Sequence, residues 1–331
     1  MEPIRPVDAP ATSVETFRRA FPDELSCEVY TQFHRYNVSG ICPHCASVVT
    51  WTRLRNRKSY VCNKCRRFFS PLAKTAFDHT RLGIRIIFFA LLLYSQSSQG
   101  ISVNFVRRHL GISHKAAWKL LDRIRTHTAL QLPINRLGHT GPVWIDEVLT
   151  RIGPDDQPIC VLGMTDAVSC QLQIIADRSW RSLGPPILEY VAPQAVLITD
   201  GWPAYRRLGR LGFEHRVVNH SRGMWVNRSG DDMNRIEGIW ANLRRLLRGS
   251  RAQISVSNYW KILAELQFRY STSLQPDEAF WRLIANFPRA DENSVNRVMA
   301  RFDRRLKVEP KDKASSIHAG KGLPVQKFPI G

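Results

Sequence analysis

Residues 143–147 read Val-Trp-Ile-Asp-Glu, and residues 196–201 read Val-Leu-Ile-Thr-Asp-Gly. Each stretch is an apolar run that ends in an acid, which predicts a strand with a carboxylate at its end. An acid in that position costs little free energy only if it reaches water, hydrogen-bond donors or a cation. The pair Asp146 and Asp200 therefore indicates a shared metal site.

The sequence around these two stretches predicts a mixed α/β domain. Two more apolar runs bounded by polar clusters lie at 159–164 and 170–175, and a helical stretch near 183–190 follows them. Helical periodicity returns from about residue 232. Three strands, a helix, a fourth strand and then helices is the order of an α/β fold.

A third polar group is expected on the helix that begins near Asn234. The residues that predict its buried stripe are Ile236, Ile239, Trp240, Leu243 and Leu247. Three polar residues share the face beside that stripe, at helical spacing: Asn234, Glu237 and Arg244. This face can look back at both aspartates, with either Glu237 or Asn234 as the third ligand.

Carboxylates grouped in this way suit the cleavage and joining of phosphodiesters. That chemistry needs an activated nucleophile and a stabilised leaving oxygen, and two Mg²⁺ ions about 3.5 to 4 Å apart provide both. Hard cations such as Mg²⁺ or Mn²⁺ prefer oxygen ligands. Glu147 follows Asp146 directly, so strand alternation predicts that its side chain points to the opposite face, in a supporting role.

Nearer the N-terminus, four cysteines form two C-x2-C pairs separated by sixteen residues: Cys42, Cys45, Cys62 and Cys65. This spacing predicts one structural Zn²⁺ held by four thiolates, with no coordination position left for catalysis. Four unligated structural or redox cysteines are the alternative. The segment between and beside the pairs is rich in Lys and Arg, and Arg57 and Lys58 are candidate contacts to a phosphate backbone.

The next segment predicts a helix, a tight turn at Gly111 and a second helix from Ser113. This pattern is typical of a helix-turn-helix. The second helix directs Lys115, Lys119 and Arg123 outward, which makes them candidate DNA contacts. A purely structural helical hairpin is the alternative.

The composition of the 331-residue chain agrees with a polyanionic partner. Lys and Arg number 48 against 28 Asp and Glu, which gives a formal charge of +20, while 44% of residues are apolar. Such a charge favours nucleic acid or a membrane surface. The longest apolar run, 86–94, has nine residues, whereas a bilayer span needs about 20. No secretory signal is visible in residues 1–14, so we expect a cytoplasmic, nucleoid-associated protein.

In these motifs the chain resembles the zinc-ribbon branch of bacterial insertion-sequence transposases, the ISXO-like group with a DDE domain. The resemblance covers residues 30 to 285. Besides the cysteine quartet it rests on Ile145-Asp-Glu147, Thr199-Asp-Gly201, and Asn234-Arg-Ile-Glu-Gly-Ile-Trp240. It implies a ribonuclease-H-like catalytic domain, divalent metal, and movement of the element that encodes the protein.

The resemblance also implies roles for individual residues. It makes Asp146 and Asp200 the first two metal ligands and favours Glu237 over Asn234 as the third, because Arg244 then lies where relatives place a basic residue. The sequence departs from the family pattern in three ways. It has a single glycine, Gly153, after the Asp-Glu pair, Asp232 where a histidine is common, and Arg244 in place of lysine.

The expected organisation has five parts: a loosely ordered lead-in (1–30), a zinc ribbon (31–75), a helix-turn-helix region (76–138), a ribonuclease-H-like DDE domain (139–290) and a basic tail (291–331). The expected partners are double-stranded DNA, as inverted repeats and target, and further copies of the chain. The alternative function is a transposase-derived DNA-binding regulator without catalytic activity, and a nuclease that does not join ends is a third possibility.

Overall fold

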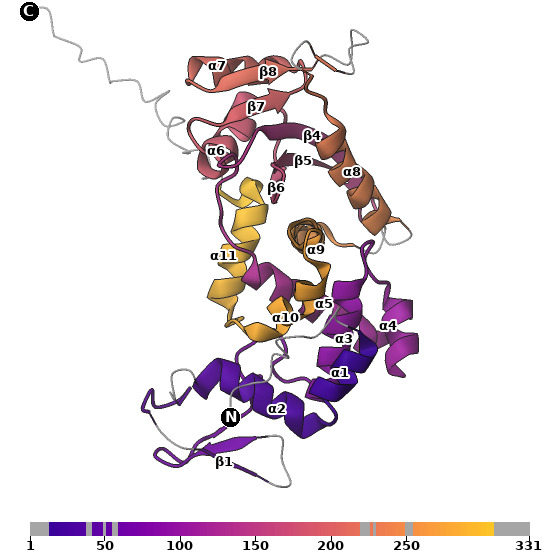
Figure 1. Cartoon of the computed structure of the whole chain (residues 1–331), viewed down its shortest axis with the longest axis vertical. Coiled ribbons are helices and arrows are strands. Elements are labelled where there is room, and N and C mark those ends of the chain that lie inside the picture. The colour runs from indigo at the N-terminus through magenta and orange to yellow at the C-terminus, as the bar shows by residue number, and fades with distance from the viewer. Residues whose placement is uncertain are drawn as a thin grey trace, which may run out of the picture.

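The computed structural model places a small ribbon, a helical layer and a mixed sheet along one long axis (Figure 1). The ranges of the chain that it describes are 13–37, 42–48, 51–54, 59–218, 226–227, 230–248 and 254–307. In the described part, no helix is long and apolar enough to cross a membrane. The candidate contacts Arg57 and Lys58, the first twelve residues and the tail from 308 lie outside these ranges.

The ribbon is a three-stranded antiparallel sheet at one end of the molecule. Its strands are β1 (Trp51–Arg53), β2 (Tyr60–Cys62) and β3 (Phe68–Phe69). Buried Glu28 accepts a 2.8 Å hydrogen bond from Arg53, which ties the ribbon to the preceding helix.

Helices form the middle of the molecule. They are α1 (Val14–Ala20), α2 (Glu24–Gln32), α3 (Ile84–Gln96), α4 (Val103–Leu110), α5 (His114–Gln131), α9 (Tyr259–Thr272), α10 (Pro276–Ala285) and α11 (Glu292–Phe302), with a π-helical turn at Phe33–Asn37 and 3-10 turns at Val256–Asn258 and Arg304–Lys307. The loosely ordered lead-in expected over 1–30 is not seen from residue 13 onward, because Phe17 and Phe21 are buried in the core. The first part of the expected tail is likewise a helix, since α11 buries Val298 and Phe302.

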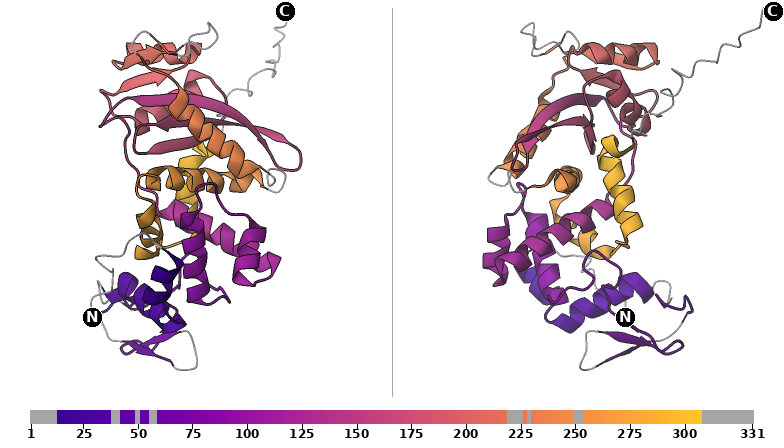
Figure 2. Two further views of the ribbon diagram at one scale, coloured as in Figure 1. Left: turned by 45° about the vertical axis from the view of Figure 1, so that its right-hand side comes forward. Right: turned by 180° about the vertical axis from the view of Figure 1, so that it is seen from behind.

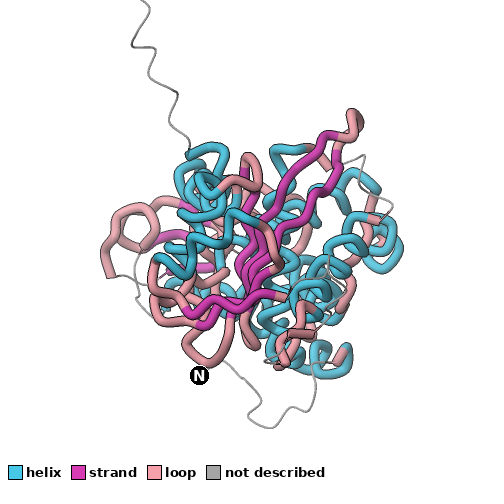
Figure 3. The backbone as a smooth tube through the Cα atoms, turned by 90° about the horizontal axis from the view of Figure 1, so that it is seen from above, coloured by secondary structure: helices cyan, strands magenta, loops and turns pink. Residues whose placement is uncertain are grey.

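A five-stranded mixed sheet lies at the other end, and it confirms the α/β class. Its order is β6-β5-β4-β7-β8, formed by β4 (Val143–Ile152), β5 (Gln157–Thr165), β6 (Cys170–Ile175), β7 (Val196–Thr199) and β8 (Glu214–Val217). The first three strands are antiparallel, whereas β7 runs parallel to both β4 and β8. The β4–β5 hairpin extends beyond the other strands of the sheet (Figure 3). The edge strand β8 was not predicted from the sequence.

Both faces of this sheet are covered. Helix α6 (Trp180–Tyr190) packs on one face, where Leu183 and Ile187 join a cluster with Val143 and Ile145. Helices α8 (Asn234–Leu247) and α9 pack on the other (Figure 2). A 3-10 turn (Pro203–Arg206) and α7 (Arg207–Arg210) connect β7 to β8.

One buried cluster joins the helical layer to the α8 face of the sheet. It extends from Phe17 in α1 to Phe302 in α11 and includes Val161 and Ile198 of the sheet. The helical layer and the sheet therefore share a continuous hydrophobic core, and each stabilises the position of the other.

Candidate functional site

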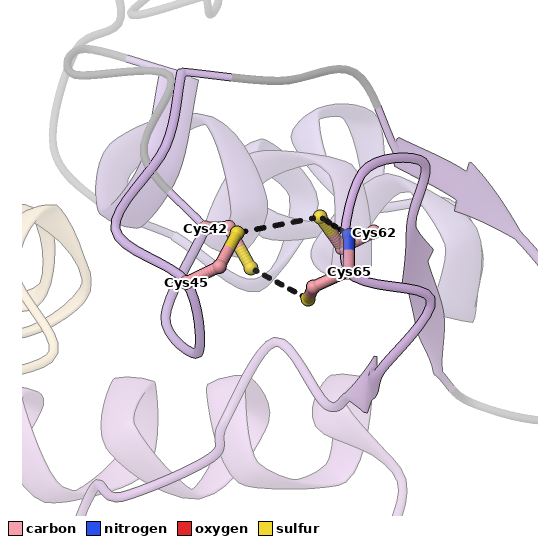
Figure 4. Close-up of side chains that lie close together, drawn as sticks. All are labelled: Cys42, Cys45, Cys62 and Cys65. Atoms are coloured by element: carbon pink, nitrogen blue, oxygen red, sulfur yellow. Dashed lines mark hydrogen bonds between the residues drawn. The ribbon is translucent and has the colours of Figure 1, made fainter.

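The four cysteines of the ribbon converge on one point (Figure 4). Their sulfur atoms all lie within 4.8 Å of one another, and the Sγ atoms are 3.8 Å apart in Cys42–Cys65 and 3.9 Å in Cys45–Cys62. Tetrahedral zinc with Zn–S bonds of about 2.3 Å requires sulfur separations of about 3.8 Å. A disulfide would require about 2.05 Å. The quartet thus fits one structural Zn²⁺.

Two equivalent turns produce this geometry. In the first, the N–H of Ala46 donates to the carbonyl of Cys42 at 3.0 Å; in the second, the N–H of Arg66 donates to that of Cys62 at 2.9 Å. Ala46 and Arg66 both adopt the left-handed region, with φ of 53° and 58°. Each C-x2-C pair is therefore shaped by its own local turn.

The two predicted aspartates lie on neighbouring parallel strands. Ile145 of β4 pairs with Thr199 of β7, so Asp146 and Asp200 follow at adjacent positions. Alternation along the strands places both acids on the α8 face of the sheet. Asp200 stands one residue beyond the end of β7, where its Oδ1 accepts a 2.9 Å hydrogen bond from the N–H of Trp202.

Helix α8 approaches the sheet directly over Asp146. The indole of Trp240 donates to Oδ2 of Asp146 at 2.8 Å. Gly163 of β5 is the register partner of Asp146, and a Cβ there would stand 2.5 Å from the Trp240 ring. The absence of a side chain at Gly163 is what lets Trp240 reach the aspartate.

The environment of Asp146 disfavours a bare negative charge. The pKa of Asp146 is raised to about 6, chiefly by burial and also by the charges of Glu147 and Asp200, while the hydrogen bond from Trp240 opposes the shift. A bound cation would offset both the burial and the repulsion.

The remaining candidates lie on α8, with Asn234 and Glu237 in its first turn and Arg244 in its last. Glu237 and Arg244 are exposed on the flank of the helix next to its buried stripe. Asn234 is also exposed, and its backbone N–H and side-chain amide both donate to Asp232 at 2.9 Å. The departure at Asp232 therefore has a local role in the structure: its carboxylate holds the start of α8.

The carboxylates are more widely spaced than the cysteines. Among the described residues, the cysteine quartet is the only group of three or more His, Cys, Asp or Glu whose ligand atoms all lie within 4.8 Å of one another. Two ions about 4 Å apart, each about 2.1 Å from its oxygens, can join oxygens up to about 8 Å apart. Carboxylates that hold two ions thus need not converge as closely as the four thiolates do.

A group of linked side chains, whose contacts with one another the sequence did not predict, lies next to Asp200. We call Glu147, Arg178, Trp202 and Tyr205 the Glu147 cluster. Glu147 is on the face opposite Asp146, as alternation predicts, and accepts hydrogen bonds from both Arg178 and Tyr205. Burial raises the pKa of Tyr205 well above its usual 10, so its phenol stays a donor. Two members had a signal in the sequence: Glu147 through its place next to Asp146, and Tyr205 through the family resemblance, which includes it after Thr199-Asp-Gly201.

The candidate DNA-contacting helices are α4 and α5. Gly111 ends α4 in the left-handed region with φ of 63°, and the hydroxyl of Ser113 caps α5. Lys115 and Lys119 are exposed on α5, whereas Arg123 is half-buried and donates to the carbonyl of Asp78 at 2.6 Å. Lys115 and Lys119 are thus more accessible to a ligand than Arg123.

Comparison with known families identifies the class of domain that contains the carboxylate site. Residues 146–271 match the family model of the ISXO2-like transposase domain. This range begins at Asp146 and includes Asp200 and Glu237, and it covers less than half of the chain. The resemblance found in the sequence is confirmed.

A curated relative comes from a mobile element. The chain is 29% identical over 263 residues to an uncharacterized protein in transposable element ISH50 of Halobacterium salinarum. The aligned region covers 71% of this chain and 86% of that protein. The two matches together support a transposase, and a transposase domain implies DNA as the partner.

Proposed function

We propose that this protein is a DNA transposase that cuts and joins strands at the ends of an insertion sequence, using a divalent-metal site formed by Asp146, Asp200 and Glu237. One observation carries the proposal: two acids at adjacent positions of parallel strands share a sheet face under the helix that carries Glu237. Asn234 is the rival third ligand. The mixed α/β sheet supports a ribonuclease-H-like fold for residues 139–290.

In this proposal, Mg²⁺ or Mn²⁺ bound by the acids would activate the attacking oxygen and stabilise the leaving oxygen. The side chains of the protein would bind the cations and orient the DNA. The indole of Trp240 occupies Oδ2 of Asp146, which leaves Oδ1 for a cation. Arg244, which is exposed two turns beyond Glu237 on the same flank, would bind a DNA phosphate.

DNA recognition is assigned to the N-terminal half. Lys115 and Lys119 on α5 would contact one end of the element, with α4 and α5 acting as a helix-turn-helix. The zinc ribbon would add phosphate contacts, including those proposed for Arg57 and Lys58. Synapsis of two ends would require a homo-oligomer on DNA, associated with the nucleoid.

The test is a cleavage and joining assay. Wild-type protein, Asp146→Asn and Asp200→Asn are incubated with DNA from both sides of the coding sequence, with and without Mg²⁺. We expect wild type to cut and join only with metal, and both variants to bind the DNA without reaction. Binding without reaction by wild type would instead support a DNA-binding regulator, and cutting without joining would support a nuclease.

A further inference from the structure

Glu147 is a buried carboxylate whose two oxygens are both engaged. Its side chain is 1% exposed. One oxygen accepts from the guanidinium of Arg178 and the other from the phenol of Tyr205. Because Glu147 points away from the face of Asp146, it cannot bind a cation there without losing both partners.

Arg178 and Trp202 hold each other in two ways. The guanidinium carbon of Arg178 lies 3.9 Å from the centre of the Trp202 ring, a cation–π contact. The indole N–H of Trp202 donates to the carbonyl of Arg178 at 2.9 Å. The segment before α6 is therefore fixed against the turn that follows Asp200.

The turn after Asp200 carries both Trp202 and Tyr205, the two residues that link it to Glu147. The backbone N–H of Trp202 donates to Oδ1 of Asp200 at 2.9 Å, and Tyr205 lies three residues further along. Glu147 is thus connected to this turn in two ways. It contacts Tyr205 directly, and it contacts Arg178, which in turn packs on Trp202.

An ion pair with one partner buried, as Glu147 is here, adds little net stability. Desolvation offsets most of its attraction, and apolar residues of similar volume are often at least as stabilising. A charged carboxylate with two fixed donors does, however, orient its partners more strictly than apolar packing does. The charge at Glu147 is therefore better explained by positioning than by stability.

We propose that Glu147 is a positioning residue: through Tyr205, and through Arg178 and Trp202, it fixes the turn that carries Asp200 relative to the strand that carries Asp146. Adjacent residues of β4 would then have complementary tasks. Asp146 would supply a metal ligand on the α8 face of the sheet, and Glu147, on the α6 face, would fix the position of Asp200. The metal-binding part of this inference rests on the proposed function.

The experiment measures the turn and the metal site separately. Protein labelled with ¹⁵N-tryptophan is examined by NMR, and the Trp202 signals are assigned with Trp202→Phe. Exchange of the Trp202 backbone amide is measured without metal, and Mn²⁺ affinity is measured on unlabelled protein. The variants are Glu147→Gln and Arg178→Lys, and Asp200→Asn reports whether Mn²⁺ binds at this site.

The matched control is Glu214→Gln. Glu214 lies on β8 of the same sheet and also pairs with an arginine, Arg216, but its side chain is 59% exposed. We expect Glu147→Gln to speed exchange of the Trp202 amide about tenfold and to weaken Mn²⁺ binding about tenfold, the lower range for loss of a group that orients a metal ligand. Arg178→Lys, which keeps a charge and loses the planar contact, should have a smaller effect of the same kind. Glu214→Gln should change neither.

Each other result has a definite meaning. Unchanged Trp202 exchange in both Glu147→Gln and Arg178→Lys would overturn the inference. Faster exchange with unchanged Mn²⁺ affinity would reduce Glu147 to a structural residue. If wild type and Asp200→Asn bind Mn²⁺ equally, the proposed function fails, while the exchange data still decide whether Glu147 holds the turn. Should Glu147→Gln not fold, Arg178→Lys decides, since its side chain is 43% exposed and tolerates change.

Discussion

The four-cysteine centre and the carboxylate site are built in opposite ways. Each pair of cysteines is set by its own local turn, so sequence spacing alone determines most of the geometry. The proposed carboxylate ligands come from β4, from the turn after β7 and from α8, so their arrangement depends on how the sheet and α8 pack. We therefore expect the first site to depend on its metal and the proposed second site to depend on the core beneath it.

Removal of zinc should have the largest effect and should be confined to the ribbon. Zinc binding in small zinc modules contributes on the order of 10 kcal/mol to folding. We expect Cys62→Ser, or a chelator, to abolish binding of one zinc per chain and the exchange protection of residues 59–69, while 143–165 stay protected. Zinc content by mass spectrometry and hydrogen exchange report both.

Cys160→Ser is the control, because Cys160 is buried in β5 away from the quartet. It should leave the zinc content unchanged. If removal of zinc also abolished the hydrogen-exchange protection of residues 143–165, the ribbon and the five-stranded sheet would not be independent, which would contradict the account.

Gly163→Ala should damage the carboxylate region alone. The added Cβ would lie 2.5 Å from Trp240, and overpacking of this kind costs about 1–3 kcal/mol. We expect a free energy of unfolding in urea lower by about 3 kcal/mol, with zinc retained. Gly209→Ala, where a Cβ meets nothing within 4 Å, is the matched control. Equal stability of the two variants would show that α8 does not pack as described.

Asp146→Asn should stabilise the metal-free protein in a pH-dependent way. Because the pKa of Asp146 is raised from 3.8 to about 6, its contribution to stability is full below pH 4 and is lost as the pH rises through 6. Asparagine does not ionise, so the variant should gain at most about 3 kcal/mol at pH 7 and nothing at pH 3.5. Thermal unfolding at several pH values measures this.

Asp156→Asn provides the comparison for that series, since Asp156 is 57% exposed at the hairpin turn. Its stability should follow that of wild type at every pH. A gain for Asp146→Asn that does not depend on pH would contradict the assigned cause.

The smallest effects should come from α5. Lys119→Ala removes one exposed charge, so the slope of log Kd against log salt concentration should fall by about 0.9 if Lys119 meets a phosphate. Arg123→Ala removes a bond to the Asp78 carbonyl and should mainly lower the Tm by a few degrees. Binding curves with one DNA duplex at several salt concentrations distinguish the two. An unchanged slope for Lys119→Ala would remove it from the DNA surface.

The sequence allowed the α/β class, most strand positions and the quartet to be predicted, because periodicity and ligand spacing are local. It did not predict β8, whose run Glu214–Val217 is short and polar. Nor did it predict the roles of Gly163 and Arg178, since these depend on which helix crosses which strand. The helical order of residues 13–32 was missed because Phe17 and Phe21 gain their stability from distant partners such as Phe280.

The most direct test of the central claim, that Asp146 and Asp200 share a divalent cation, is cleavage of the polypeptide by Fe²⁺ bound in place of Mg²⁺, with ascorbate and peroxide. We predict cuts near residues 146 and 200, and near 237 if Glu237 is the third ligand. Excess Mg²⁺ and the Asp146→Asn variant should both suppress them. Cuts that avoid both aspartates, or that persist in Asp146→Asn, would contradict the account.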